Sequence, residues 1–330
     1  MTDAAGYSAL DADSAGVSAR LDVPGDWRRA GKGGPYRLFW RDADGYGQVL
    51  PRPAAAEVPE FYAVDGYYTH GGAEGSAEDG ADGGIAARQG PGWRVLRHLA
   101  WRADKGVEAT VEWWAALLGP APLQVIEVGC GDGIILERLR SLGHAVTGVE
   151  PDPSAAAVAR GRGLTIHQAK AEDLPTTLRD GQSDLVILSH VLEHCLDPAA
   201  ALANCRRALK PGGRIMVEVP NNAATGLAMH GATWLWLDVP RHLNFFTDTS
   251  LAAILRTAGF QIRRTEHLGY CRQVSADWLA GQDRVAQVLG LRARSGIFHQ
   301  VQWLVRTWAA PPQHKYDTLR IVALCGDGAG

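Results

Sequence analysis

The stretch LQVIEVGCGDGIIL, residues 123–136, joins a short apolar run to a glycine turn and the start of a helix. The run is typical of a strand buried within a parallel sheet. The spacing E-x-G-x-G-x-G places Glu127, Gly129, Gly131 and Gly133 at the turn. Glycine is needed where the backbone adopts a positive φ, or where it lies against a ligand with no Cβ between them. This segment therefore predicts a strand, turn and helix that bind a ligand.

Strands and helices alternate on the C-terminal side of this segment. Apolar runs that predict strands lie at residues 145–150, 164–169, 184–189 and 214–219, with helical segments among them at residues 154–161 and 199–209. Strands separated by helices of this size are joined by right-handed crossovers in a doubly wound parallel sheet. A ligand is expected at the carboxyl edge of such a sheet.

The C-terminal part departs from this alternation. A helix is predicted at residues 250–259 and a strand at residues 260–268, and the run at residues 318–325 is predicted to pair antiparallel with that strand. Residues 271–312 look helical and amphipathic and are inserted between the two strands. We therefore predict an α/β fold: a Rossmann-like, seven-stranded, mostly parallel sheet with flanking helices, an N-terminal arm and a helical insertion before the last strand.

Composition divides the chain into three parts. Residues 1–35 are predicted to form a disordered tail, because the first twenty or so carry few large apolar side chains. Residues 36–90 combine an aromatic arm with a Gly-rich, acidic linker that begins at residue 71. Residues 91–330 are predicted to form the main domain, with residues 271–312 as its helical cap.

Charge and cysteine content exclude several classes of protein. The chain has 33 Lys and Arg against 36 Asp and Glu, so its net charge of −3 points to neither a nucleic-acid nor a membrane partner. Five cysteines without a C-x-x-C pair favour reduced thiols over a disulfide framework. The chain also lacks a signal-peptide pattern and any apolar run near the roughly 18 residues that a bilayer crossing needs. These features predict a soluble, cytoplasmic protein.

The glycine turn admits two kinds of cofactor. The dinucleotide fingerprint G-x-G-x-x-G rests a pyrophosphate on a helix N-terminus, but the spacing after Gly131 is one residue too short for it. Asp132 also places a negative charge where a pyrophosphate needs partial positive charge. S-adenosylmethionine has no phosphate, and its ammonium group can be attracted by Glu127 or Asp132. The turn therefore favours S-adenosylmethionine over NAD.

Acids after the next two strands suit the rest of this cofactor. Glu150 ends a strand 21 positions after Gly129, where its carboxylate can accept hydrogen bonds from both ribose hydroxyls. Glu172 and Asp173 follow the third strand, where an acid can accept a hydrogen bond from the adenine amine. A lone glycine turn often makes only a tight connection, but four features in order at this spacing favour a cofactor site.

The motifs EVGCGDG, VEPD, AEDLP, SHVLEHCLDP, LKPGGRIMVEVPN, RHLNFFT and LAAILRTAGF, within residues 120–270, resemble those of class I S-adenosylmethionine-dependent methyltransferases. The chain is similar to the small-molecule and polysaccharide-modifying subgroup and to ubiquinone-pathway O-methyltransferases. Lys170 stands where many relatives have an acidic adenine contact, so that role shifts to Glu172 or Asp173. The predicted cofactor site comprises Glu127, Gly129, Cys130, Gly131, Gly133, Glu150, Pro151, Glu172, Asp173, Ser189 and His190.

Two histidines are candidates for the chemistry. Methyl transfer from a sulfonium is an in-line displacement, so the enzyme mainly positions the reactants, and a hydroxyl acceptor must also lose a proton. His242 lies in the aromatic stretch PRHLNFF, and an imidazole there can take that proton. His190, after the fourth strand, is the second catalytic candidate. For both, packing or a backbone hydrogen bond is the alternative role.

His190, Glu193 and His194 also spell H-x-x-E-H, a zinc-binding pattern when one helix presents both histidines. Here His190 ends a strand, and Asp197-Pro198 follows at once, so we predict no metal ligand. In ubiquinone-pathway relatives an acid, two residues and Glu-His at this place resemble a divalent-metal site. By that resemblance a divalent metal stays an alternative.

The sequence thus favours methyl transfer to a small molecule, with a hydroxyl of a sugar or secondary metabolite as acceptor and nitrogen or carbon as alternatives. An NAD-dependent oxidoreductase is disfavoured by the glycine spacing, and a non-enzymatic protein that binds S-adenosylmethionine is a third interpretation. A nucleic-acid methyltransferase is disfavoured because no basic run is interleaved with aromatics and SHVLEH is not a base-flipping motif. The helical block at residues 271–312 is also compatible with a homodimer interface.

Overall fold

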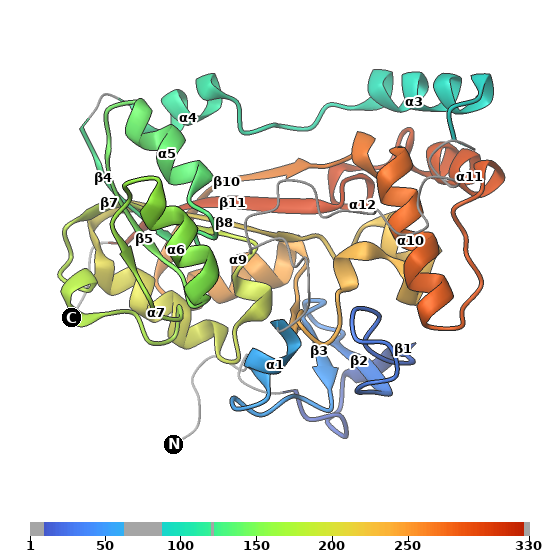
Figure 1. Cartoon of the computed structure of the whole chain (residues 1–330), viewed down its shortest axis with the longest axis horizontal. Coiled ribbons are helices and arrows are strands. Elements are labelled where there is room, and N and C mark those ends of the chain that lie inside the picture. Colours follow the sequence, from blue (N-terminus) through green and yellow to red (C-terminus); the bar gives the residue numbers. More distant parts are fainter. Residues whose placement is uncertain (1–9, 63–87, 120–121, 327–330) are drawn as a thin grey trace.

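The structure is a computed structural model that describes residues 10–62, 88–119 and 122–326, and a seven-stranded sheet forms its centre (Figure 1). In spatial order the strands are β10 (Phe260–Leu268), β11 (Thr318–Cys325), β8 (Leu209–Pro220), β7 (Ser183–Ser189), β4 (Gln124–Val128), β5 (Ala145–Val149) and β6 (Ile166–His167). The strands from β8 to β6 are parallel, whereas β11 is antiparallel to both of its neighbours. This order confirms the predicted mostly parallel sheet.

Helices cover both faces of this sheet. They are α4 (Val111–Leu118) and α5 (Ile134–Ser141) on one face, α7 (Pro198–Ala208) and α9 (Asp248–Thr257) on the other, and α6 (Pro153–Gly161) after β5. In β7, Val186 and Leu188 pack with α7 and α9, whereas Leu185 and Ile187 pack with α4 and α5. Successive residues of a strand point to opposite faces of the sheet. Because helices cover both faces, both sets of side chains are buried, which explains the unbroken apolar run of β7.

A second, four-stranded sheet joins residues that are far apart in the sequence. Its strands are β1 (Val17–Val23), β2 (Tyr36–Arg41), β3 (Gly47–Leu50) and β9 (Asn244–Phe245), which pair antiparallel in that order. The predicted disorder of residues 1–35 is therefore wrong from residue 10 onward. Val23 is buried in a core shared with the segment after β8, a partner that the local composition does not reveal.

The predicted helical insertion between the last two strands is present. Helices α10 (Ala276–Val288) and α11 (Ile297–Thr307) pack with α3 (Pro91–Ala103) around buried aromatic side chains such as Trp93 and Trp303. This helical cluster lies at the opposite end of the molecule from α5 and α6 (Figure 1). The short helices are α1 (Val58–Tyr62), η2 (Thr176–Leu178), η3 (Leu192–His194), α8 (Thr225–His230), η4 (Gly231–Thr233), η5 (Leu235–Leu237), η6 (Cys271–Val274) and α12 (Pro312–Lys315).

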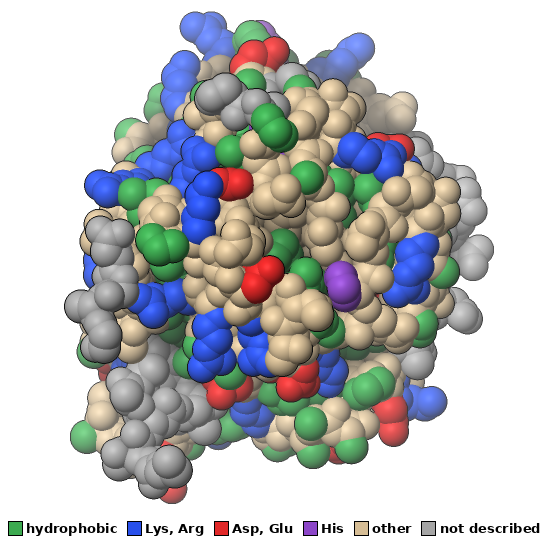
Figure 2. All heavy atoms as spheres, turned by 90° about the vertical axis from the view of Figure 1, so that its left-hand side faces the viewer, with side chains coloured by type: hydrophobic (Ala, Val, Ile, Leu, Met, Phe, Trp, Pro, Cys, Tyr) green, Lys and Arg blue, Asp and Glu red, His purple; other side chains and the backbone are tan. Residues whose placement is uncertain are grey.

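The predicted Gly-rich linker lies almost wholly outside the described residues. Within the ranges that the structure describes, no helix has both the length and the apolar character needed to cross a bilayer. Basic, acidic and apolar side chains are intermixed on the face at the α5 end of the molecule (Figure 2). This mixture agrees with the small net charge of the chain.

Candidate active site

A cavity of about 620 Å³ opens at the carboxyl edge of the parallel strands. Its walls are the turns that follow β4, β5, β6 and β7, together with α1 from the N-terminal part of the chain. Of the residues predicted to bind the cofactor, all but Gly133 and Asp173 line this cavity. His242 is not among the lining residues.

The glycines of the turn after β4 all have positive φ, at 71° for Gly129, 53° for Gly131 and 82° for Gly133. A Cβ on Gly129 would lie 2.4 Å from the Val191 side chain, and one on Gly133 would lie 2.4 Å from Leu164. Packing therefore requires these two glycines. A Cβ on Gly131 would meet none of the described atoms within 4 Å. Its backbone thus faces the open cavity, where a ligand can approach closely.

Glu127 is a buried acid beside this turn. Only 2% of the residue is exposed, and its Oε2 has no hydrogen-bond partner among the described residues. Burial, together with the charges of Glu150 and Asp132, raises the pKa of Glu127 well above its usual range. A cationic ligand group would bond the free oxygen and favour the ionised carboxylate. The ammonium group of the predicted cofactor has this chemistry.

Glu150 connects the glycine turn to the end of β5. One carboxylate oxygen accepts a hydrogen bond from the Gly131 N–H and the other from the Asp152 N–H, each at 2.8 Å. These bonds fix the orientation of the carboxylate at the cavity wall. Each oxygen keeps another lone pair, so the group can also accept from the two hydroxyls of a ribose.

The other predicted acids have different surroundings. Asp132 pairs with Arg162 at 3.1 Å and accepts a backbone N–H at the start of α5. Glu172 lines the cavity and accepts a backbone N–H from the loop after η3 at 2.8 Å. Asp173 is exposed and lies outside the cavity lining. This geometry favours Glu127 over Asp132 for an ammonium group and Glu172 over Asp173 for adenine.

His190 lines the cavity at the end of β7 and has a left-handed backbone, with φ of 55°. Its ring stacks on Trp236, with centroids 4.7 Å apart. Nδ1 lies 3.1 Å from the Glu193 carboxylate and Nε2 lies 3.4 Å from that of Glu218. Carboxylates only accept hydrogen bonds, so a carboxylate beside each ring nitrogen favours the doubly protonated, positively charged ring. Burial lowers the pKa of His190, but the two carboxylates outweigh it and raise the pKa to about 9.

Glu218, which the sequence analysis does not single out, is held in place by Arg320. The guanidinium lies 2.7 Å from Glu218 and also 3.2 Å from Glu266. Burial raises the pKa of Glu218, but His190 and Arg320 lower it to about 2 overall. A signal was present in the sequence, because a lone acid within the apolar strand RIMVEV needs a partner when buried.

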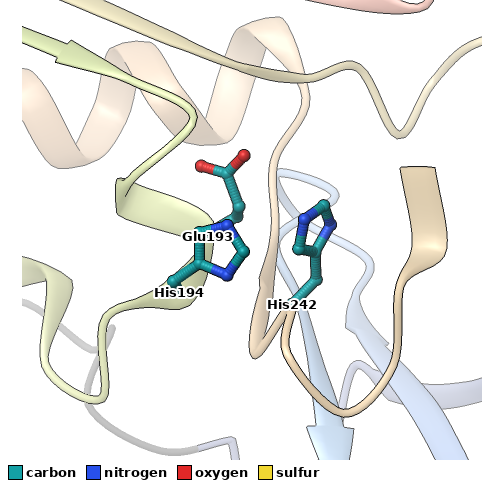
Figure 3. Close-up of side chains that lie close together, drawn as sticks. All are labelled: Glu193, His194 and His242. Atoms are coloured by element: carbon teal, nitrogen blue, oxygen red, sulfur yellow. The ribbon is translucent and has the colours of Figure 1, made fainter. Parts of the chain in front are cut away.

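Three further side chains lie close together beside His190. Glu193 and His194 belong to η3, and His242 faces them from the loop before β9 (Figure 3). One ligand atom of each lies within 4.8 Å of the others. His194 lines the cavity, whereas His242 is 4% exposed and lies behind it. Burial and the neighbouring His194 lower the pKa of His242 to about 4, so its ring is neutral near pH 7.

Hydrogen bonds determine which nitrogen of each ring is free. Nδ1 of His194 lies 3.0 Å from the Arg241 carbonyl oxygen, and Nδ1 of His242 lies 2.7 Å from that of Trp236. Carbonyls only accept, so each Nδ1 carries a hydrogen, and Nε2 is the nitrogen of each ring that could bind a metal. Among the described residues, Nε2 of His194 and Oε2 of Glu193 have no hydrogen-bond partner. Two imidazoles oriented by such second bonds, with one carboxylate, fit a divalent transition metal.

The N-terminal part of the chain completes the site. Tyr62 of α1 lines the cavity, and its hydroxyl lies 2.9 Å from Nδ1 of His194. The buried Arg241 binds both oxygens of Asp26, at 2.6 and 3.0 Å, and also pairs with Asp238. The pair with Asp26 attaches the N-terminal segment to the loop that carries His242. The sequence predicts an arm but does not indicate these contacts.

Comparison with known proteins places this chain beside methyltransferases. Residues 97–265 match the model of a family described as a methyltransferase domain. The ubiquinone biosynthesis O-methyltransferase of Xanthomonas axonopodis pv. citri is 33% identical over 172 residues, which cover 48% of this chain and 72% of that protein. The protein of the same name from Pseudomonas aeruginosa (strain LESB58) is 31% identical over 172 residues, which cover 48% and 74%.

Solved structures are more distant. A SAM-dependent methyltransferase from Archaeoglobus fulgidus has 17% identity and a TM-score of 0.44, covering 70% of this chain and 93% of that one. An S-adenosylmethionine-dependent methyltransferase from Mesorhizobium loti has 20% identity and a TM-score of 0.43, covering 66% and 98%. At these TM-scores the likeness says nothing about the reaction.

Proposed function

This chain belongs to the class I S-adenosylmethionine-dependent methyltransferases, and we propose that it transfers the methyl group to a hydroxyl oxygen of a small molecule. The cofactor cavity supplies an unpaired carboxyl oxygen at Glu127 and an oriented carboxylate at Glu150. Those groups suit the ammonium and the ribose of S-adenosylmethionine. Oxygen as the acceptor atom is supported by the names of the curated relatives, which are O-methyltransferases.

One observation carries the choice of acceptor: His190 lies on the cavity wall between two carboxylates. Transfer breaks the bond between the methyl carbon and sulfur, and the electron pair of that bond stays on sulfur. A new bond forms between the methyl carbon and the acceptor oxygen. That oxygen reacts most readily after its proton has passed to water. A positively charged ring beside it stabilises the oxygen anion but does not itself take the proton. The acceptor should therefore be an acidic hydroxyl, such as a phenol or an enol, in preference to a sugar hydroxyl.

The residues Glu193, His194 and His242 would hold a divalent metal, since one ligand atom of each lies within 4.8 Å of the others. A metal bound there would polarise an acceptor oxygen and lower the pKa of its hydroxyl. In either case His242 lies behind the cavity lining, so it positions His194 or a metal and does not contact the acceptor. This assignment replaces the general-base role that the sequence suggests for His242.

A transfer assay tests the acceptor class. The purified protein is given S-adenosylmethionine with a catechol, a sugar or an aromatic amine, and adenosylhomocysteine is measured by mass spectrometry. We expect turnover with the catechol, and a loss of about 10²-fold in His190→Gln, the usual cost of removing an electrostatic stabiliser. The affinity for adenosylhomocysteine should stay within about two-fold, because His190 is assigned to the acceptor.

The pH profile separates a charged His190 from a general base. If the charge is needed, turnover should fall as the pH rises through about 9, where the ring becomes neutral. A general base would instead give turnover that rises through its pKa. Transfer to the amine alone, or unchanged turnover in His190→Gln, would show that the acceptor assignment is wrong.

A further inference from the structure

The solvent-facing side of α11 carries a continuous apolar stripe. Its side chains are Ile297 (40% exposed), Phe298 (68%), Val301 (45%), Val305 (73%) and Trp308 (48%). Ile297, Val301, Val305 and Trp308 recur at intervals of three and four residues, and Phe298 adjoins Ile297, so the five lie along one side of the helix. The opposite side packs into the helical cluster through residues such as Trp303 and Leu304. The stripe thus consists of side chains that the fold leaves in water.

The segment that carries this stripe contains cations and no acids, and the acid that precedes it, Asp283, pairs with Arg88. From residue 284 to residue 316 there is no Asp or Glu, and Arg284, Arg292, Arg294 and Arg306 are exposed. Helix α3 packs against α11 and also contains no acid, with exposed Arg94, Arg102 and Trp101. The stripe therefore has basic surroundings in a chain whose net charge is −3.

We propose that this face of α11 binds the surface of an anionic lipid bilayer, with the helix lying in the plane of the interface. Phenylalanine, valine and isoleucine side chains enter the boundary between headgroups and acyl chains, and tryptophan is favoured at that depth. The arginines bind the anionic headgroups. With 11 residues α11 is too short to span the bilayer, so binding is peripheral.

The charges favour a lipid surface over the other partners that such a stripe can have. A two-fold contact between two copies of the chain would place these arginines near their own counterparts, with no acid in the segment to pair with them. A nucleic acid would neutralise the arginines but leave the aliphatic stripe in water. An anionic bilayer accommodates both the apolar and the basic side chains.

Sedimentation with vesicles tests this proposal on the whole chain. We expect the protein to sediment with vesicles of phosphatidylcholine and phosphatidylglycerol, less with phosphatidylcholine alone, and less as salt is added. Phe298→Ser combined with Val305→Ser should weaken binding by about ten-fold or more, because two apolar side chains no longer enter the bilayer. Val158→Ser, which removes an exposed valine on α6, is the matched control and should bind like the parent.

Other outcomes would overturn the proposal. Since α11 lies at the opposite end of the molecule from α5 and α6, the double variant should keep the parent's adenosylhomocysteine affinity (Figure 1). The proposal is wrong if the parent does not sediment with anionic vesicles, or if Val158→Ser loses as much vesicle binding as the double variant. A parent that elutes as a dimer in size-exclusion chromatography, and a double variant that elutes as a monomer, would identify the stripe as a contact between copies instead.

Discussion

Glu150 lines the cavity and accepts one hydrogen bond from the Gly131 N–H of the glycine turn and one from the Asp152 N–H after β5. Replacing it with alanine should weaken the binding of adenosylhomocysteine by about 1.5–3 kcal/mol, the range for hydrogen bonds to a charged group. Isothermal titration calorimetry measures this loss. Asp173→Ala is the control, because Asp173 is exposed and lies outside the cavity, so its affinity should not change. Equal affinities for the parent and Glu150→Ala would show that another group holds the ribose.

The residues that are predicted to bind the cofactor and that line the cavity share a local cause. Glu127, Gly131 and Glu150 belong to adjacent βα units, where the spacing along the chain fixes the spacing in the turn. The partners of His190 and His194 were not predictable in this way. Glu218 and Tyr62 come from a different strand and from the N-terminal part of the chain. A single sequence does not indicate which distant segment supplies a hydrogen-bond partner.

Helix η3 and the loop before β9 meet at Glu193, His194 and His242, so a metal bound there would need ligands from both elements. We expect the purified protein to bind Zn²⁺ or Mn²⁺. His242→Ala should weaken this binding by at least 10- to 100-fold, because losing a residue that only orients a metal ligand already costs that much. Titration calorimetry with the metal alone measures it. His267→Ala is the control, since His267 binds Asp248 outside this cluster. Equal affinities in the parent and His242→Ala would remove His242 from the metal site.

The ion pair between Asp26 and Arg241 attaches the N-terminal sheet to that same loop. Both side chains are almost fully buried, so removing the carboxylate takes away one of the two buried counter-charges of Arg241 and leaves Asp238 as the other. Asp26→Ala should lower the free energy of unfolding by about 3–5 kcal/mol, measured by chemical denaturation. Asp22→Ala breaks an exposed pair with Arg37, which solvent screens, and should leave the free energy of unfolding nearly unchanged. Similar losses in the two variants would mean that the buried pair does not fasten the sheet.

Whether an element was predictable depended on where its partner lies. The strands of the large sheet are continuous apolar runs, because helices cover both of their faces. Strand β1 reads VSARLDV, and most of its side chains are exposed or half-buried, so composition alone suggested disorder. Its neighbours include a core built from residues after β8, which no local pattern reveals.

At the scale of the whole molecule, the cavity draws its walls from four strand ends and from α1. A ligand there contacts segments that are distant in the sequence. It should therefore stabilise the fold as a unit and not only one turn. The N-terminal part of the chain contributes to the cavity, because Tyr62 of α1 lines it. The ion pair between Asp26 and Arg241 attaches the N-terminal sheet to the loop behind the cavity.

Adenosylhomocysteine should raise the melting temperature of the whole chain, whereas NAD should not. A ligand that binds only the folded state at 100 times its dissociation constant adds about 2.7 kcal/mol, which corresponds to a rise of several degrees at this chain length. NAD should fail because its pyrophosphate would lie near Glu127 and Asp132, two acids. Differential scanning fluorimetry measures the melting temperature with each ligand. In Glu150→Ala, the same rise in melting temperature should need a higher concentration of adenosylhomocysteine. An equal rise with NAD would mean that the cavity accepts a dinucleotide, and no rise with either ligand would remove the cofactor from this cavity.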